Sequence, residues 1–178
     1  MGRGRLTAVT DAGPLIHLTE IGCLHILSIF GNLHMPEAVW AETVECGRTS
    51  SEDFMKLSKV ERHNISSIDI TWFVEKNNLK DLHSGECECL CLCKQIDVPI
   101  LLTDDLAVRG AAKRLKLVPV GSLGIVAKAH HLGKISLADA QHHILNLYEV
   151  SSLFVTKVIV EMAIEQLQDP ISSVDFSP

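Results

Sequence analysis

Acidic side chains that lie far apart along the chain are the residues with the clearest potential for chemistry. They are Asp11, Glu42, Glu86, Asp104 and Asp105. Carboxylate oxygens are the ligands that hard divalent cations such as Mg²⁺ prefer, and water and substrate phosphate complete the coordination shell. Metal ions held in this way activate water and stabilise the leaving oxygen of a phosphodiester. These residue types therefore predict metal-assisted phosphodiester hydrolysis, provided that the fold brings them together.

Each of these acids also has a purely structural explanation. Asp11 fits the N-cap of the helix that follows it, and Asp104 or Asp105 fits the N-cap of a later helix. Glu42 fits a solvated helix face, and Glu86 fits the first turn of a helix, where a carboxylate interacts favourably with the dipole. The residue types leave both explanations open, so the elements that position the acids are the next consideration.

Short apolar runs alternate with amphipathic stretches along the chain. The runs that predict strands are Leu6–Thr10, Leu33–Met35, Val60–Phe73, Val98–Thr103 and Val118–Val120. The stretches with a helical period are Gly13–Phe30 (stopped by Gly31 and Asn32), Glu37–Glu45, Gly85–Gln95 (capped by Ser84), Leu106–Leu115, Ser122–His131, Leu137–Tyr148 and Val155–Gln168. The polar segment Cys46–Glu52 is expected to be a loop or lid.

Strands that alternate with helices predict a three-layer α/β/α fold with a mainly parallel central sheet. Ligands of such folds bind at the carboxyl ends of the strands. Asp11 directly follows the first expected strand, and Asp104 and Asp105 follow the strand that ends at Thr103. We expect one domain over residues 1–168 and a frayed tail over 169–178, which contains two prolines.

Four segments that contain these acids resemble, in order, the motifs of PIN domains, the nuclease family that includes VapC-type toxins. The segments are TDAGPLI at Thr10–Ile16, MPEAVWAE at Met35–Glu42, SGECE at Ser84–Glu88 and LLTDD at Leu101–Asp105. One such motif is a weak signal, whereas four in the expected order and elements are much more specific. The resemblance covers roughly residues 6–133 and finds no family motif between Gly47 and Leu82.

The resemblance implies a Mg²⁺- or Mn²⁺-dependent endoribonuclease, commonly dimeric and often inhibited by a cognate antitoxin protein. Asp11 would be the first metal ligand, and Glu42 and Glu86 the second and third carboxylates. The fourth remains open: counting two places past the motif's threonine selects Asp105, while the adjacent Asp104 is the alternative. Hydrolysis of RNA by the toxin of a toxin–antitoxin pair is the leading hypothesis.

Two features favour different functions. Many relatives have Ser or Thr at the position of Ala12, and the net charge of −6 is unusual for a protein that binds nucleic acid. Both would suit a degenerate PIN-like module that binds RNA or protein without turnover. A structure-specific DNA nuclease would use the same chemistry, and the sequence does not discriminate it.

Basic residues follow the last acidic motif. Arg109 and Lys113 are four positions apart, so they share one helix face and are candidates for contacts with substrate phosphate. The apolar positions of Val155–Gln168, together with Leu145 and Leu147, predict a surface that packs on the core or forms a homodimer. No stretch approaches the length of a membrane span, and no signal peptide is recognisable, so we expect a cytoplasmic protein.

Cys87, Cys89, Cys91 and Cys93 alternate within one predicted helix. Four thiolates suit a zinc or redox cluster, but residues two apart on a helix face different directions and do not converge on one ion. Small buried side chains are the favoured interpretation.

The tandem histidine pairs at 130–131 and 142–143 are poor chelates for a similar reason, because adjacent helical residues diverge. We expect these pairs on the surface or facing a partner. His17 and His25 are expected to pack on helices without a ligand.

Overall fold

The structure is a computed structural model that describes residues 6–57 and 59–168. The strands are β1 (Leu6–Thr10), β2 (Phe30–Pro36), β3 (Val60–His63), β4 (Ile100–Leu102) and β5 (Val118–Val120). The helices are α1 (Ala12–Glu20), η1 (Leu24–Ile29), α2 (Glu37–Trp40), η2 (Ala41–Glu45), α3 (Ser51–Met55), α4 (Ser67–Asn77), α5 (Ser84–Gln95), α6 (Leu106–Arg114), α7 (Ser122–His131), α8 (Leu137–Glu149) and α9 (Lys157–Leu167).

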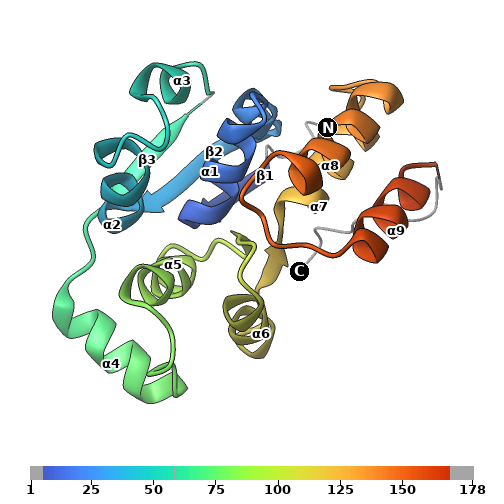
Figure 1. Ribbon diagram of the computed structural model, residues 1–178. Helices are drawn as coiled ribbons and strands as arrows, with labels where there is room; N and C mark the ends of the chain where they lie inside the picture. The colour runs from blue at the N-terminus through green and yellow to red at the C-terminus, as the bar shows by residue number, and fades with distance from the viewer. Residues whose placement is uncertain (1–5, 58, 169–178) are drawn as a thin grey trace, which may run out of the picture.

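The five strands form one parallel sheet in the order β3-β2-β1-β4-β5. Helices α4, α5 and α6 lie on one side of this sheet, and α1, α7, α8 and α9 lie on the other (Figure 1). The described residues therefore confirm the predicted three-layer α/β fold with a parallel sheet.

The order of the strands reverses between β1 and β4. From β1 the chain moves to β2 and then β3 on one side, whereas β4 and β5 lie on the other side. At such a reversal the connections leave on opposite faces and open a crevice at the carboxyl ends of the strands. Asp11 follows β1, and Asp104 and Asp105 follow β4 after Thr103, so the topology brings two acidic segments to this crevice.

Helix α5 is buried against the centre of the sheet, where it packs on β1, β2 and β4. Its four cysteines are all buried and none forms a disulfide. Burial is the largest cause of the raised pKa of the Cys89 and Cys93 thiols, which keeps them neutral. These observations agree with small buried side chains and show no zinc-type grouping of thiols among the described residues.

The prediction of one long helix up to Phe30 is wrong. Helix α1 ends at Glu20, and Gly22 adopts a left-handed φ of 69°, which turns the chain into the short 3-10 helix η1. Strand β2 begins at Phe30, so Gly31 and Asn32 lie inside a strand and do not stop a helix. A glycine with positive φ is favoured because it has no Cβ.

The prediction of a strand over Val60–Phe73 is correct only for its first residues. Strand β3 ends at His63, and Ser66 caps helix α4 by accepting a hydrogen bond from the backbone N–H of Asp69 at 3.2 Å. The apolar residues of this segment suggest a strand, but Ile68 lies on α4 and is 79% exposed. Their spacing therefore does not mark one buried face. The local cap therefore prevails over the hydrophobic pattern.

Smaller differences concern the ends of elements. Ser84 does not cap α5, because the N-cap is His83, and the predicted loop Cys46–Glu52 ends inside the short helix α3, which begins at Ser51. The expected frayed tail at 169–178 lies outside the described residues. Over residues 6–57 and 59–168, no helix combines the length and hydropathy required to cross a bilayer.

Candidate active site

All five predicted carboxylates line one pocket at the carboxyl edge of the sheet. This pocket has a volume of about 560 Å³, and its walls include Asp11, Glu42, Glu86, Asp104 and Asp105. The acids come from four segments: the start of α1, helix η2, the first turn of α5 and the loop between β4 and α6. The fold thus brings together acids that are as far as 94 positions apart in the sequence.

Asp11 is partly buried between Ala12 and Thr103. Its Oδ1 accepts a hydrogen bond from the backbone N–H of Ala12 at 2.8 Å, and its Oδ2 accepts one from the Thr103 hydroxyl at 3.0 Å. Burial raises the pKa of Asp11 from 3.8 to about 6, and the carboxylates of Glu86 and Glu42 contribute to the rise while these hydrogen bonds oppose it. Asp11 does cap α1, so its structural and chemical explanations are both compatible with the geometry.

Asp104 is committed to contacts within the protein. Its Oδ1 accepts from the backbone N–H of Ser122 at 2.7 Å, and its Oδ2 accepts from the Ser122 hydroxyl at 2.5 Å. The same Oδ2 lies 2.8 Å from Nδ1 of His17. A Cβ atom at Gly121 would lie 2.8 Å from Asp104 Oδ1, so this close approach requires a glycine. Asp104 therefore ties α1 to the start of α7 at the wall of the pocket.

Asp105 makes fewer side-chain hydrogen bonds than Asp104. It is the N-cap of α6, where its Oδ1 accepts from the backbone N–H of Val108 at 2.9 Å. Its side chain is exposed, and its Oδ2 has no partner among the residues described. Of the two adjacent acids, Asp105 is thus better able to offer an oxygen to a ligand.

Glu42 and Glu86 line the same pocket from two helices, η2 and α5. Glu42 lies in η2, a turn of π-helix that continues directly from α2; such widened turns are frequent at functional sites. Glu86 lies at the third position of α5, and one of its oxygens accepts from the backbone N–H of His83 at 2.9 Å in a capping box. Its structural role as a capping residue leaves the second carboxylate oxygen available to the pocket.

The carboxylates of this pocket suit a hydrated hard cation better than an ion that is bound by protein ligands alone. No three of the five carboxylates bring ligand atoms within 4.8 Å of one another in the described part of the chain. Mg²⁺ keeps several waters and is commonly bound through one or two carboxylates, so wider spacing suits it. Burial is the main cause of the raised pKa of Asp11 and the charges of Glu86 and Glu42 add to it, so a bound cation would favour the ionised form.

The two basic residues predicted to bind phosphate lie outside the pocket lining. Both are on α6, where the guanidinium of Arg109 donates to the carbonyl of Thr103 at 3.4 Å and Lys113 is exposed one turn later. Arg109 therefore packs against the loop that carries Asp104 and Asp105, outside the pocket. Their contact with a substrate stays a prediction.

Several pocket residues were not foreseen as parts of the site. His17 was expected to pack without a ligand, but it contacts Asp104. His83, Leu153 and Phe154 also line the pocket, and Phe154 is 98% exposed. The position of His17 directly after the first motif was an available signal, whereas nothing local marks the segment before α9 as part of the site.

The comparisons with known proteins give one family. A family model described as a PIN domain matches residues 7–169. This match spans most of the chain and includes every acid of the pocket. The comparisons with curated proteins and with solved structures found no match.

Proposed function

The chain belongs to the PIN-domain family of nucleases, and from this membership we propose that it is a divalent-metal-dependent endoribonuclease. Hydrolysis would leave a 5′-phosphate and a 3′-hydroxyl. The observation that carries the proposal is the convergence of five carboxylates from four segments on one pocket at the switch point of the sheet.

Asp11, Glu42, Glu86 and Asp105 are the residues that would hold Mg²⁺ or Mn²⁺. When bound, such an ion supplies an activated water and neutralises charge on the phosphodiester. Asp11 is fixed by Ala12 and Thr103, so its orientation is set before any ligand arrives. Asp104 acts as a positioning residue through His17 and Ser122, because its oxygens are already engaged.

An exposed aromatic side chain at the pocket supports a single-stranded RNA substrate. Phe154 precedes α9 and lines the same pocket as the carboxylates while remaining 98% exposed. An unpaired base can stack on such a ring, which is worth about 1–3 kcal/mol per base in single-strand binding proteins. A base on Phe154 would hold the adjoining backbone beside the acids.

The test is cleavage of single-stranded and structured RNAs by the full chain with Mg²⁺ or Mn²⁺. We expect cleavage that disappears in EDTA and falls at least about 100-fold in Asp11→Asn, Glu86→Gln and Asp105→Asn, because changes outside the ligand shell of a metal already cost about 10–100-fold. Glu75→Gln removes an exposed carboxylate of α4 outside the pocket and is the matched control. Intact RNA with both metals, and no effect of Asp11→Asn, would refute the proposal.

A binding module without turnover is the alternative that a specific observation favours. Ala12 brings no hydroxyl to the pocket, although the Thr103 hydroxyl reaches Asp11 from the other side. That alternative predicts RNA binding without cleavage and without a saturable metal site. Cleavage of a branched DNA substrate in preference to every RNA would instead indicate a structure-specific DNA nuclease.

We further propose that the protein acts as the toxin of a toxin–antitoxin pair and forms a homodimer. Apolar side chains of α8 and α9 are exposed at Leu145, Val158, Ile159 and Met162, whereas Leu147 is fully buried and belongs to the core. A second copy or an antitoxin segment would cover this face. Light scattering that shows a dimer in the native chain and a monomer in Met162→Glu would support self-association, and a monomer in both would oppose it.

Arg109 and Lys113 are proposed as secondary contacts for phosphate beyond the pocket. Because both are on α6, whose N-terminus carries Asp105, an RNA strand leaving the acids would pass along this helix. Lower salt dependence of RNA binding in Lys113→Ala would support this placement. Unchanged salt dependence would remove Lys113 from the binding surface.

A further inference from the structure

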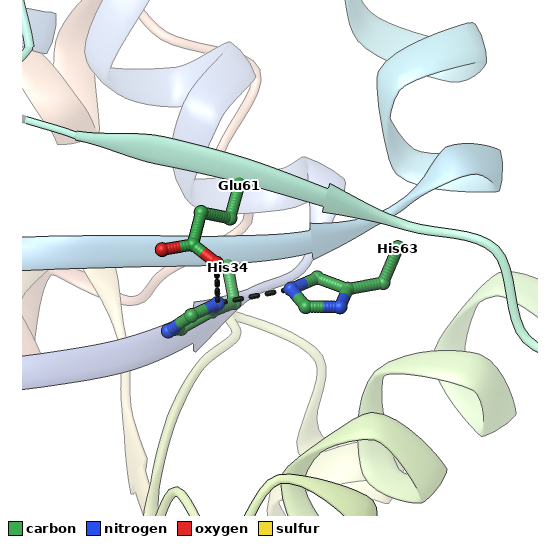
Figure 2. A group of neighbouring side chains, drawn as sticks. All are labelled: His34, Glu61 and His63. Atoms are coloured by element: carbon green, nitrogen blue, oxygen red, sulfur yellow. Dashed lines mark hydrogen bonds and ion pairs between the residues drawn. The ribbon is translucent and has the colours of Figure 1, made fainter.

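A second group of metal-ligating side chains lies away from the carboxylate pocket, on strands β2 and β3. It consists of His34, Glu61 and His63, whose ligand atoms all lie within 4.8 Å of one another. None of the three lines the pocket of the proposed active site. Figure 2 shows the two histidine rings and the carboxylate turned toward one another.

The sheet register explains why these side chains converge. His34 on β2 pairs with Glu61 on β3, so the two side chains point to the same face of the sheet. His63 is two residues after Glu61 and therefore also points to that face. The convergence is thus fixed by the backbone pairing of two strands and does not depend on a flexible loop.

The distances are close to those that a tetrahedral ion requires. His34 Nδ1 lies 2.9 Å from His63 Nε2 and 3.8 Å from Glu61 Oε2. With bonds of about 2.0–2.1 Å, two ligand atoms on a tetrahedral Zn²⁺ are separated by about 3.3 Å. The two separations lie on either side of this value, so small side-chain rotations would give three ligands and leave one position open.

The surroundings of the group fit a metal site. Lys59 Nζ contacts the other carboxylate oxygen of Glu61 at 2.5 Å, which fixes the orientation of the carboxylate. His34 is buried with 9% of its surface exposed, while Glu61 and His63 are partly exposed and give an ion access from solvent. Partners that orient ligands in this way are a regular part of metal sites.

We propose that His34, Glu61 and His63 bind a Zn²⁺-class ion that ties the edge strand β3 to β2. Two imidazoles and one carboxylate select borderline metals over Mg²⁺, which prefers oxygen ligands. Strand β3 has only four residues and is paired to β2 alone. A metal bridge between the strands would therefore stabilise the edge of the sheet.

The ion would also act on the segment that carries Glu42. Arg62, between Glu61 and His63, forms an ion pair with Glu37, and its guanidinium lies 4.3 Å from the Trp40 ring centroid. These contacts anchor α2 to β3, and α2 continues directly into η2. Fixing β3 thus fixes the helix that leads to the pocket.

The experiment is calorimetric titration of the full chain with Zn²⁺ in excess Mg²⁺, which would occupy the carboxylate pocket under the proposed function. We expect one Zn²⁺ site whose affinity falls more than about 100-fold in His63→Ala and in Glu61→Gln, because changes outside the ligand shell already cost 10–100-fold. His142→Ala, which removes an exposed histidine of α8, should bind as the native chain does. These variants avoid the buried His34, and their folding is verified by thermal melting.

Three results would overturn the proposal. One is unchanged Zn²⁺ affinity in both His63→Ala and Glu61→Gln, and another is loss of the site in Asp11→Asn, which would move the ion to the carboxylate pocket. The third is a sulfur-to-metal charge-transfer band when Co²⁺ replaces Zn²⁺, which would assign the ion to cysteine. Since Asp11→Asn tests the nuclease proposal and His63→Ala tests this one, the two fail independently.

Discussion

Replacing Asp11 by Asn should stabilise the metal-free protein at alkaline pH. The folded-state pKa of Asp11 is about 6, above its ordinary value of 3.8, and burial is the main cause. The neutral form is therefore favoured by folding below pH 3.8, and this advantage is lost as the pH rises through 6. Above that range the native protein holds a buried negative charge that Asn does not carry.

The size of the effect follows from the pKa difference. A difference of about 2 corresponds to at most about 3 kcal/mol at pH 8, and about half of this at pH 5. The Asn side chain can keep the contacts, because its oxygen can accept from Ala12 N–H and its amide can donate to the Thr103 hydroxyl. For a chain of this size, 3 kcal/mol raises Tm by about 6–12 °C.

The assay is thermal melting in EDTA at pH 8 and at pH 5, with Glu75→Gln as the control for loss of an exposed carboxylate. We expect Asp11→Asn to melt above the native chain at pH 8, by a smaller margin at pH 5, and to be inactive at both. Adding Mg²⁺ should reduce the difference in Tm, because Mg²⁺ binds the native chain more tightly than the Asp11→Asn protein and so stabilises it more. An Asp11→Asn protein that is equally or less stable at pH 8 in EDTA would refute the reasoning.

Three further predictions concern other parts of the molecule. Phe154→Ala should raise KM for single-stranded RNA by about 5- to 150-fold with little change in kcat, since one stacked base is worth about 1–3 kcal/mol; steady-state kinetics would show this, and an unchanged KM would contradict it. Gly121→Ala should lower the free energy of unfolding by about 1–3 kcal/mol and so lower Tm, because its Cβ would lie 2.8 Å from Asp104 Oδ1. Gly85→Ala is the control, because a Cβ at Gly85 has no atom within 4 Å and should not lower Tm. The same Tm for both variants would exclude the clash. Cys46 is the one exposed cysteine of six, so a thiol reagent should titrate about one thiol in the native protein and all six after unfolding. Rapid reaction of more than two thiols would show that α5 opens, because Cys23 is the only buried cysteine outside it.

Local chemistry explains the features of the fold that were predicted correctly. Strand β5 and helix α7 have the predicted bounds because a short β-branched run and a helical period are each contained within one segment. The strand predicted over Val60–Phe73 is wrong beyond His63 because the apolar residues there do not share one buried face, so their spacing gave a misleading period. The predictions of catalysis, metal, partner and dimer from the sequence stay predictions.

The sequence by itself determined which acids follow strands, since a strand end and the aspartate after it are adjacent in the chain. It also determined the family, because the four acidic segments keep their order. Only the tertiary structure decided that Asp104 is engaged while Asp105 has an oxygen to offer, because the partners of Asp104 are His17 and Ser122, one of them 87 residues away. Contacts between distant segments depend on how the whole chain packs, and local spacing carries no record of them.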